Sequence, residues 1–485
     1  MLIASYGQVH NCMATGTESI TDSLELRIHQ AFRYWHDPTR TDGVLTDLLA
    51  FAEPAPDAPL DLRTRTNDFL REALQRLAVD QPIDAELLTA RFIERTPADQ
   101  VALKLKFAES TIFMKQNQAI KRLAKIVAEM EAAAWRERRR RIDDRIPVPA
   151  ATDPVGHDAH LAHLFDLLQR PDAPWIISLE GIGGIGKTTL AAALLRTVAA
   201  TRTFADFGWV SAKAGILDLG GAIRAVPQPT LTMRALVADL LRQLAPEAAD
   251  SLLAFQEQAL SFLRARLKRT PHLIVIDNLE TVSDLEALAP ALLTLANPTK
   301  FVLTSRKRLV DESGIYLYPV PELSECNALK LVRQEATLRN LPEVANAADA
   351  DLRPIYATVG GNPLALLLVV GLTHVHSLSV VLRHLREARG LPAENLYTYV
   401  YRQAWDALDE LHQQVLLAMP LTTVHGETLE FIAAICDLPP AVTADALHRL
   451  YTLNLVTAGG DLHQRRYAIH SLTRTFLHEQ VARWL

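Results

Sequence analysis

Eight consecutive residues have the types and spacing of a phosphate-binding loop. The stretch from Gly181 to Thr188 is Gly-Ile-Gly-Gly-Ile-Gly-Lys-Thr and fits the pattern G-x-x-x-x-G-K-[ST]. Glycines let a backbone turn several N–H groups onto one anion, and a helix N-terminus adds a partial positive charge. The lysine can reach the β- and γ-phosphates, and the threonine hydroxyl can bind Mg²⁺. The pattern predicts binding of a nucleoside triphosphate by Gly181, Gly183, Gly184, Ile185, Gly186, Lys187, Thr188 and Thr189.

The residues on either side of this loop predict the elements that position it. Residues 175–180 are an apolar run typical of a buried strand, and residues 189–195 are typical of a helix. The same glycines also fit the dinucleotide pattern Gly-x-Gly-x-x-Gly, with Asp206 at about the spacing of a ribose-binding acid. Asp206 precedes the strand-like stretch 207–211 instead of following it, and this alternative gives the lysine and threonine no role. We therefore prefer the P-loop interpretation.

A second polar cluster follows an apolar stretch further along the chain. Residues 273–276 are Leu-Ile-Val-Ile, and Asp277 follows them directly. By itself the stretch could equally be a buried strand that ends in an Asp-Asn turn. Its position after a P-loop favours a carboxylate that holds Mg²⁺ through water, together with Thr188. Residues 300–306 form another apolar stretch with a polar end, where Arg306 either reaches a γ-phosphate or is one of several solvated arginines.

The order of these stretches predicts the fold class. Strand-like segments at 207–212, 273–277, 300–306 and 314–320 alternate with helical segments. Such alternation predicts a parallel sheet with helices on both faces, and ligands of such sheets bind at the carboxyl ends of the strands. The rest of the chain is rich in Leu and Ala at helical spacing, so we expect a mostly α protein with one α/β part.

Composition excludes several classes of protein. The apolar fraction is 49% and the charged fraction is 22%, as in ordinary globular proteins. A net charge of −6 gives no global signal for nucleic acid or membrane. Three cysteines are too few and too scattered for a disulfide framework or a zinc site. The sequence has no apolar run long enough to span a membrane and no signal-peptide pattern, so we expect a cytoplasmic protein without a membrane partner.

Taken in order, the motifs resemble the NB-ARC branch of the STAND signalling ATPases. The matching stretches are the P-loop, Trp209-Val210-Ser211, Ile276-Asp277-Asn278, Leu303-Thr304-Ser305-Arg306, Gly361-Asn362-Pro363 and Tyr467-Ala468-Ile469-His470-Ser471-Leu472. The resemblance implies a nucleotide domain, a helical domain and a winged helix that bind ATP or ADP with Mg²⁺. It also implies that Pro363 packs near the base and that His470 contacts the β-phosphate of ADP.

Three motifs depart from the family pattern. His157 and His160 stand in a segment where the family has Gly-Arg-x-x-Glu, which leaves the base contacts undefined. Asn278 replaces the acid that often follows the Walker B aspartate, and Glu280 lies two positions later. A misplaced general base predicts slow hydrolysis, with Lys187, Asp277, Arg306 and Glu280 as the catalytic candidates. Ser471 replaces the acid of the Met-His-Asp motif, which predicts a latch of altered strength.

Residues 84–135 carry a separate pattern. A helical stretch at 84–94 is followed by Thr96-Pro97-Ala98-Asp99, which supplies an N-cap, a proline at the first helical position and a nearby acid. A short helix at 99–106, a turn at 107–109 and a longer helix capped by Ser110 follow. Two helices joined by a short turn suggest a helix-turn-helix and resemble the last region of bacterial sigma factors. The apolar positions of the longer helix are Ile112, Phe113, Ala119, Ile120, Leu123 and Val127.

The other face of the longer helix could bind nucleic acid. Between Lys104 and Lys125 six basic residues stand against one acid, Glu109. Basic residues can neutralise phosphates, and amides can hydrogen-bond to base edges. The candidate residues are Lys115, Asn117, Gln118, Lys121 and Arg122. The alternative is a solvated amphipathic helix that packs on a partner protein.

These observations predict a nucleotide-gated switch. ADP would hold an off state, ATP would release it and favour homo-oligomers, and the N-terminal helices would bind DNA as a transcription regulator. In the alternative, a defence or cell-death switch, the same helices recruit a protein effector; an unknown sensor protein is expected in either case. The expected parts are a disordered or non-native start (1–20), an all-α domain (21–141), a linker (142–152), a P-loop domain (153–322), a helical lid domain (323–402) and a winged helix (403–485).

Overall fold

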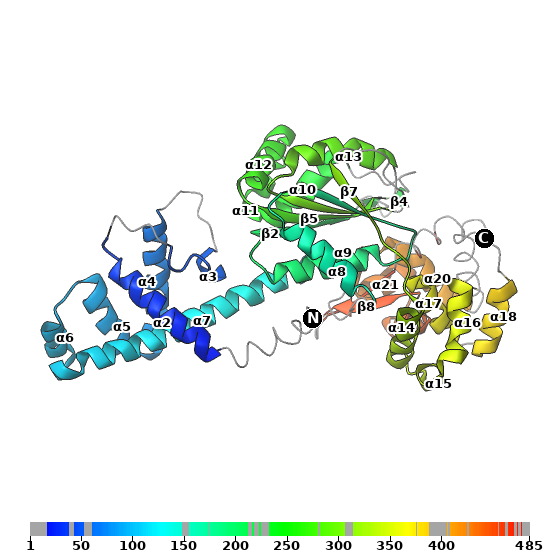
Figure 1. The fold of residues 1–485 in the computed structure, drawn as a ribbon. Helices are drawn as coiled ribbons and strands as arrows, with labels where there is room; N and C mark the ends of the chain where they lie inside the picture. The colour runs from blue at the N-terminus through cyan, green and yellow to red at the C-terminus, as the bar shows by residue number, and fades with distance from the viewer. Residues whose placement is uncertain are drawn as a thin grey trace. The chain divides into compact units, whose positions relative to one another are not determined.

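The chain folds as two units, residues 1–141 and 142–485, and each is described by itself (Figure 1). The structure is a computed structural model. It describes residues 17–485 except 38–42, 53–60, 148–154, 173, 212–215, 218–222, 225–231, 280–281, 306–313, 375, 388–404, 406–407, 424–425, 454, 461–463, 470–472, 474–476 and 478–485. Among these described residues, no helix is both long and apolar enough to cross a membrane.

The first unit is all helical, as predicted. Its elements are α2 (Thr17–Arg33), α3 (Leu49–Ala52), α4 (Leu62–Asp80), α5 (Pro82–Leu88), a π-turn η1 (Thr89–Ile93), α6 (Ala98–Leu105), a 3₁₀ turn η2 (Glu109–Thr111) and α7 (Ile112–Arg145). Their apolar faces share one core, which includes Ile28, Phe32, Leu70, Leu87 and Leu123. The short helix, turn and long helix expected between residues 99 and 135 are therefore present as α6, η2 and α7.

A five-stranded sheet forms the centre of the second unit. The strands are β1 (Ile176–Glu180), β2 (Asp206–Ser211), β5 (His272–Leu279), β6 (Lys300–Ser305) and β7 (Ile315–Pro319). Their order is β2-β5-β6-β1-β7, and every adjacent pair is parallel. The predicted parallel sheet is confirmed. Because β1 lies between β6 and β7, the loop that follows β1 leaves the carboxyl edge of the sheet beside the end of β6.

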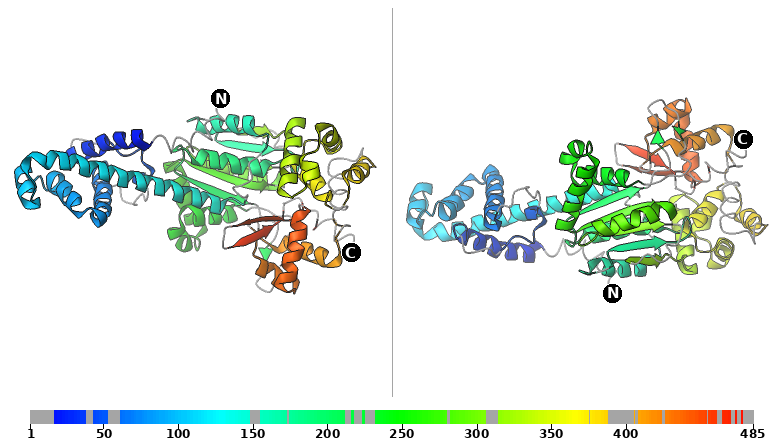
Figure 2. Two further views of the ribbon diagram at one scale, coloured as in Figure 1. Left: turned by 90° about the horizontal axis from the view of Figure 1, so that it is seen from below. Right: turned by 90° about the horizontal axis from the view of Figure 1, so that it is seen from above.

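Helices cover both faces of this sheet (Figures 1 and 2). On one face, α10 (Met233–Leu244), α11 (Pro246–Leu252), α12 (Gln256–Arg269) and α13 (Val282–Leu295) pack on Ile274 and Ile276. On the other, α8 (Asp158–Gln169) and α9 (Lys187–Ala199) pack on Leu273 and Val275. Alternate residues of β5 thus enter different cores, as the two-residue period of a strand requires. A small antiparallel pair, β3 (Ile216–Leu217) and β4 (Ile223–Arg224), lies outside this sheet.

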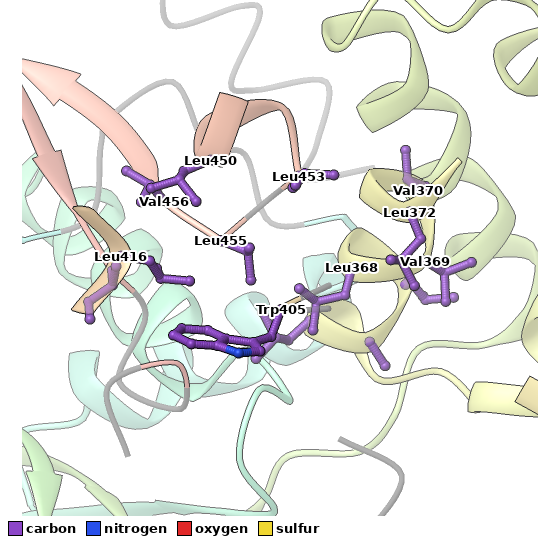
Figure 3. Packing of buried hydrophobic residues seen from close by; sticks show 14 of the residues in the cluster. Leu368, Val369, Val370, Leu372, Trp405, Leu416, Leu450, Leu453, Leu455 and Val456 are labelled. Atoms are coloured by element: carbon purple, nitrogen blue, oxygen red, sulfur yellow. The ribbon is translucent and has the colours of Figure 1, made fainter. Parts of the chain in front are cut away.

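The rest of the second unit is mainly helical and shares one core. The elements after the sheet are α14 (Glu325–Leu338), α15 (Pro342–Ala345), α16 (Asp349–Val359), α17 (Pro363–Leu372), α18 (Leu378–Glu387), α20 (Glu410–Ala418), η3 (Met419–Leu421), α21 (Leu429–Cys436), α22 (Pro440–Thr452), β8 (Thr457–Gly460) and β9 (Arg465–Ala468). The last three helices and the antiparallel β8–β9 hairpin form the expected winged helix. Apolar residues of the helical and winged-helix segments form a single hydrophobic core (Figure 3). The predicted boundary between these two domains therefore does not separate two cores.

Three expectations need correction. Residues 142–145 are not linker but the end of α7: Ile142 is buried in the core below the sheet, and Arg145 Nη1 donates to Asp206 Oδ1 at 2.9 Å. Helix α2 begins at Thr17, inside the expected disordered start. Phe113 belongs to the apolar positions of α7, yet it is 58% exposed, because the helical rotation that buries Ile112 turns its neighbour outward.

Candidate nucleotide-binding site

The predicted P-loop connects the end of β1 to the start of α9. Gly184 and Gly186 both have positive φ, 74° and 100°, where glycine carries no steric penalty. A Cβ atom on Gly184 would lie 2.7 Å from Leu364 Cβ, and one on Gly186 would lie 3.2 Å from His157 Nε2. Because backbone conformation and close neighbours both exclude a side chain, these positions require glycine.

Lys187, the first residue of α9, folds back over the loop. Its Nζ donates to the carbonyl oxygens of Gly181 at 2.7 Å and Ile182 at 2.9 Å, and the residue is buried. The ammonium group is therefore held at the loop itself. A lysine in this position can move from the carbonyl oxygens to phosphate oxygens by rotating its own side chain.

The next two carbonyls of the loop are held by α17. Asn362 Nδ2 donates to Gly183 O at 2.9 Å, and Leu364 N donates to Gly184 O at 3.3 Å. Pro363, between them, lies 4.0 Å from the position of a Cβ atom on Gly186. Four successive carbonyls from Gly181 to Gly184 thus have donors.

A buried cluster of polar side chains lies beside the P-loop, at the carboxyl end of β5 and β6. Asp277 Oδ1 accepts hydrogen bonds from Thr188 Oγ1 at 2.8 Å and from Thr304 Oγ1 at 2.6 Å. The Thr304 hydroxyl also accepts from Asn278 N at 2.8 Å, and this fixes which way its proton points. Burial raises the pKa of the Asp277 carboxyl, whereas the hydrogen bonds from Thr304 and Thr188 and the nearby Lys187 charge oppose that rise.

The donor set fits Mg²⁺ bound together with a nucleotide. Mg²⁺ keeps several waters and takes one or two protein oxygens plus phosphate oxygens. The Thr188 hydroxyl and the Asp277 carboxylate are adjacent, so one metal could bind the first directly and the second through water. Within the part of the chain that the structure describes, no three His, Cys, Asp or Glu side chains gather as a metal site. A metal here would therefore need the phosphates of the nucleotide as ligands.

His157 closes the other side of the loop. It precedes α8, is 3% exposed, and its Nδ1 has no hydrogen-bond partner among the described residues. The pKa of His157 is lowered to about 4, chiefly by burial and also by the neighbouring His160, and Asp158 opposes both effects. The imidazole is therefore neutral at pH 7 and offers one donor and one acceptor nitrogen.

The structure brings together only part of the predicted set. Lys187, Thr188 and Asp277 meet at the P-loop, and Pro363 approaches it. Arg306, Glu280 and His470 lie outside the described residues. Sequence reasoning missed Thr304 and Asn362 as site residues. Each belongs to a quoted motif, and Thr304 lies next to the last residue of β6, so position at the sheet edge was the signal for it.

Some of the nucleic-acid candidates of α7 contact other side chains of the first unit. Lys121 Nζ lies 3.9 Å from Glu25 Oε2, and Arg122 binds Asp84 and Gln81. Lys115 Nζ lies 5.6 Å from the ring centroid of Phe107. Two further candidates, Asn117 and Gln118, are exposed, as is Lys125.

Large apolar side chains accompany these polar groups at the same end of the unit. Leu103 of α6 and both Phe113 and Met114 of α7 are exposed. This face therefore mixes cationic, amide and apolar groups, and it does not present a purely basic surface.

A parallel sheet with a glycine-rich loop between β1 and a helix, and a threonine and aspartate side by side at that loop, define a P-loop NTPase. Residues 157–341 match the family model of the NB-ARC domain. This part of the chain is therefore an NB-ARC domain.

Two curated relatives each match more than half of the chain. TMV resistance protein N of Nicotiana glutinosa is 25% identical over 291 residues, which are 58% of this chain and 24% of that protein. Regulatory protein AfsR of Streptomyces griseus is 26% identical over 311 residues, 62% of this chain and 29% of that protein. The chain thus spans less than a third of the length of these two relatives.

Among solved structures, a STAND protein with a tetratricopeptide repeat sensor from Pyrococcus horikoshii is similar, with a TM-score of 0.46 and 17% identity. The similarity covers 69% of this chain and 44% of that protein.

Proposed function

We propose that this protein is a nucleotide-gated signalling switch, off with ADP bound and on with ATP bound, that hydrolyses ATP slowly. The observation that carries the proposal is the contact between the P-loop and α17. Gly183 and Gly184 accept hydrogen bonds from the first residues of a helix that belongs to the helical segment. A nucleotide that enters the loop would act on this contact, because the nucleotide and the start of α17 would both bind the backbone of the P-loop.

The chemistry of the switch would come from the buried cluster. Lys187 would move from the loop carbonyls to the phosphates, and Thr188 with Asp277 would hold Mg²⁺. When bound, Mg²⁺ would supply positive charge to the β- and γ-phosphates. The family resemblance assigns a γ-phosphate contact to Arg306, a base contact to Pro363 and an ADP contact to His470, and Glu280 is the candidate general base.

Switching needs only a difference in affinity. If ATP and ADP bind the open and closed states with different free energies, each nucleotide shifts the population toward the state it prefers. The open state would expose surfaces for self-assembly, and the N-terminal unit would carry the output. DNA is the first candidate partner because α6, η2 and α7 follow the helix-turn-helix order. An effector protein is the alternative, favoured by exposed Leu103, Phe113 and Met114.

The test is nucleotide binding and release by the full chain. We expect ATP and ADP to bind in the presence of Mg²⁺, and we expect His470→Ala to release ADP faster than wild type. Stopped-flow dilution of a fluorescent ADP analogue measures that release. An unchanged ADP off-rate in His470→Ala would remove the proposed latch, and absence of any nucleotide binding by wild type would remove the switch.

A further inference from the structure

Asn362 connects two backbones that lie far apart in the sequence. Its side chain is 1% exposed, and its hydrogen bonds within the described part of the chain go to backbone atoms. Nδ2 donates to Gly183 O at 2.9 Å, while Oδ1 accepts from Leu364 N at 3.1 Å and Ala365 N at 3.3 Å. One amide thus caps α17 and at the same time holds the P-loop.

The opposite end of α17 contacts the winged helix. A Cβ atom on Gly371 would lie 2.5 Å from Leu453 O, so the two backbones touch where α17 ends and α22 ends. Leu368 and Leu372 of α17 belong to the same core as Leu453 and Leu455 (Figure 3). A helix of 10 residues is about 15 Å long, so one rigid element joins the P-loop to the winged-helix core.

We propose that Asn362 is a positioning residue that couples occupancy of the P-loop to α17 and, through α17, to the winged-helix core. This inference rests on the proposed nucleotide switch and names the group that carries its signal. The Gly183 carbonyl points at Asn362, which leaves the N–H groups of the loop to the anion. When phosphate orders those N–H groups, the carbonyl and the start of α17 are ordered with them.

Two further hydrogen bonds anchor the turn before α17. Leu323 N donates to Gly361 O at 2.9 Å, and Gly361 N donates to Glu322 Oε2 at 3.0 Å. Residues 322–323 lie shortly after β7, and Val320, the first residue after that strand, donates its N–H to Glu180 O at 2.8 Å. The turn before α17 is therefore tied to the same sheet edge as the P-loop. We expect a displacement of the loop backbone to displace the start of α17 as well.

The test uses substitutions that separate the two roles of this amide. Serine caps helices about as well as asparagine, so Asn362→Ser keeps an acceptor for Leu364 N but is too short to donate to Gly183. Asn362→Asp keeps the size and the cap and removes the donor. Asn346→Ser makes the same change at an exposed position of the helical segment and is the matched control. Hydrogen exchange of the full chain, with and without Mg-ADP, is measured together with Mg-ADP affinity.

We expect Mg-ADP to slow exchange at the P-loop, at α17 and at residues 453–456 in wild type and in Asn346→Ser. In Asn362→Ser the slowing should persist at the P-loop but disappear at α17 and 453–456, and ADP affinity should fall about three- to tenfold, the effect of one lost hydrogen bond. If Asn362→Ser does not fold, Asn362→Asp must show the same loss.

Wild-type protection at α17 that survives in a folded Asn362 variant would overturn the inference while leaving the nucleotide switch intact. Wild-type protein that binds no ADP would instead overturn the proposed function.

Discussion

The P-loop and the face of α7 both combine polar residues predicted to bind anions, but their surroundings differ. At the P-loop, Lys187, Asp277 and Asn362 are buried, and each contacts another part of the same site. On α7, Asn117, Gln118 and Lys121 are exposed. A buried polar group costs free energy unless it has a partner, whereas an exposed one costs almost nothing. Burial therefore makes the first set strong evidence for a binding site, and exposure leaves the second open to several functions.

Removing the P-loop lysine should have the largest effect on nucleotide binding. We expect Lys187→Ala to weaken ATP binding by about 100-fold or more, because truncating a buried charged partner costs about 2–5 kcal/mol. Isothermal titration calorimetry with Mg-ATP measures the affinity. Lys330→Ala changes an exposed lysine of the same unit and should bind as wild type does. An affinity of Lys187→Ala within threefold of wild type would contradict the P-loop assignment.

The buried histidine beside the loop gives a pH-dependent difference. The pKa of His157 is lowered to about 4, so the unfolded chain, with a histidine pKa near 6.5, binds this proton more readily. The stability that neutral His157 provides is thus complete above about pH 6.5 and falls as the pH drops toward 4. When the pH falls from 7.5 to 5, we expect protonation of His157 to lower the free energy of unfolding by about 2 kcal/mol.

Urea unfolding at the two pH values measures this cost, and His157→Gln should lose about 2 kcal/mol less than wild type on acidification. His163→Gln, which changes an exposed histidine of α8, is the control. Equal acid sensitivity of His157→Gln and wild type would show that the histidine is not held neutral.

Replacing Asp277 is a further test of the buried site. The substitution should not lower the stability of the metal-free protein, but it should weaken Mg²⁺-dependent ATP binding. Burial raises its pKa, so charge at this position costs stability at pH 7.5 when no metal is bound. Asp277→Asn should therefore leave the nucleotide-free protein as stable or more stable, while it weakens the Mg²⁺ dependence of ATP binding by about tenfold. Thermal unfolding without metal and ATP titrations with Mg²⁺ or EDTA measure the two effects. A destabilised variant with unchanged Mg²⁺ dependence would make Asp277 structural.

The sequence predicted the parallel sheet and the P-loop because both depend on local patterns. The four apolar residues before Asp277 are typical of a buried strand, and the glycines before Lys187 are typical of a phosphate-binding loop. Asn362 could not be assigned in the same way. Its pattern predicts a turn before a helix, but its contact with Gly183 depends on packing between segments about 180 residues apart. Ion pairs such as Arg122 with Asp84 were missed for the same reason, since α5 and α7 meet only in the folded unit.

Substitutions on the exposed face of α7 should have the smallest effects. Measuring their effects on DNA binding tests the function of this face. If this face binds duplex DNA, Lys121→Ala and Lys125→Ala should each weaken binding of the full chain only about two- to threefold and lower the salt dependence by about one counterion. Gln118→Ala should reduce discrimination between sequences instead. Arg122→Ala should mainly destabilise the N-terminal unit, by at most about 1 kcal/mol, because it leaves Asp84 without its partner.

Fluorescence anisotropy across a salt series, with Lys330→Ala as the control, separates these DNA-binding outcomes. No binding by wild type at low salt would rule out DNA as the partner of this face. The exposed Leu103, Phe113 and Met114 would then make an effector protein the expected partner, because exposed apolar side chains gain free energy when a protein surface covers them.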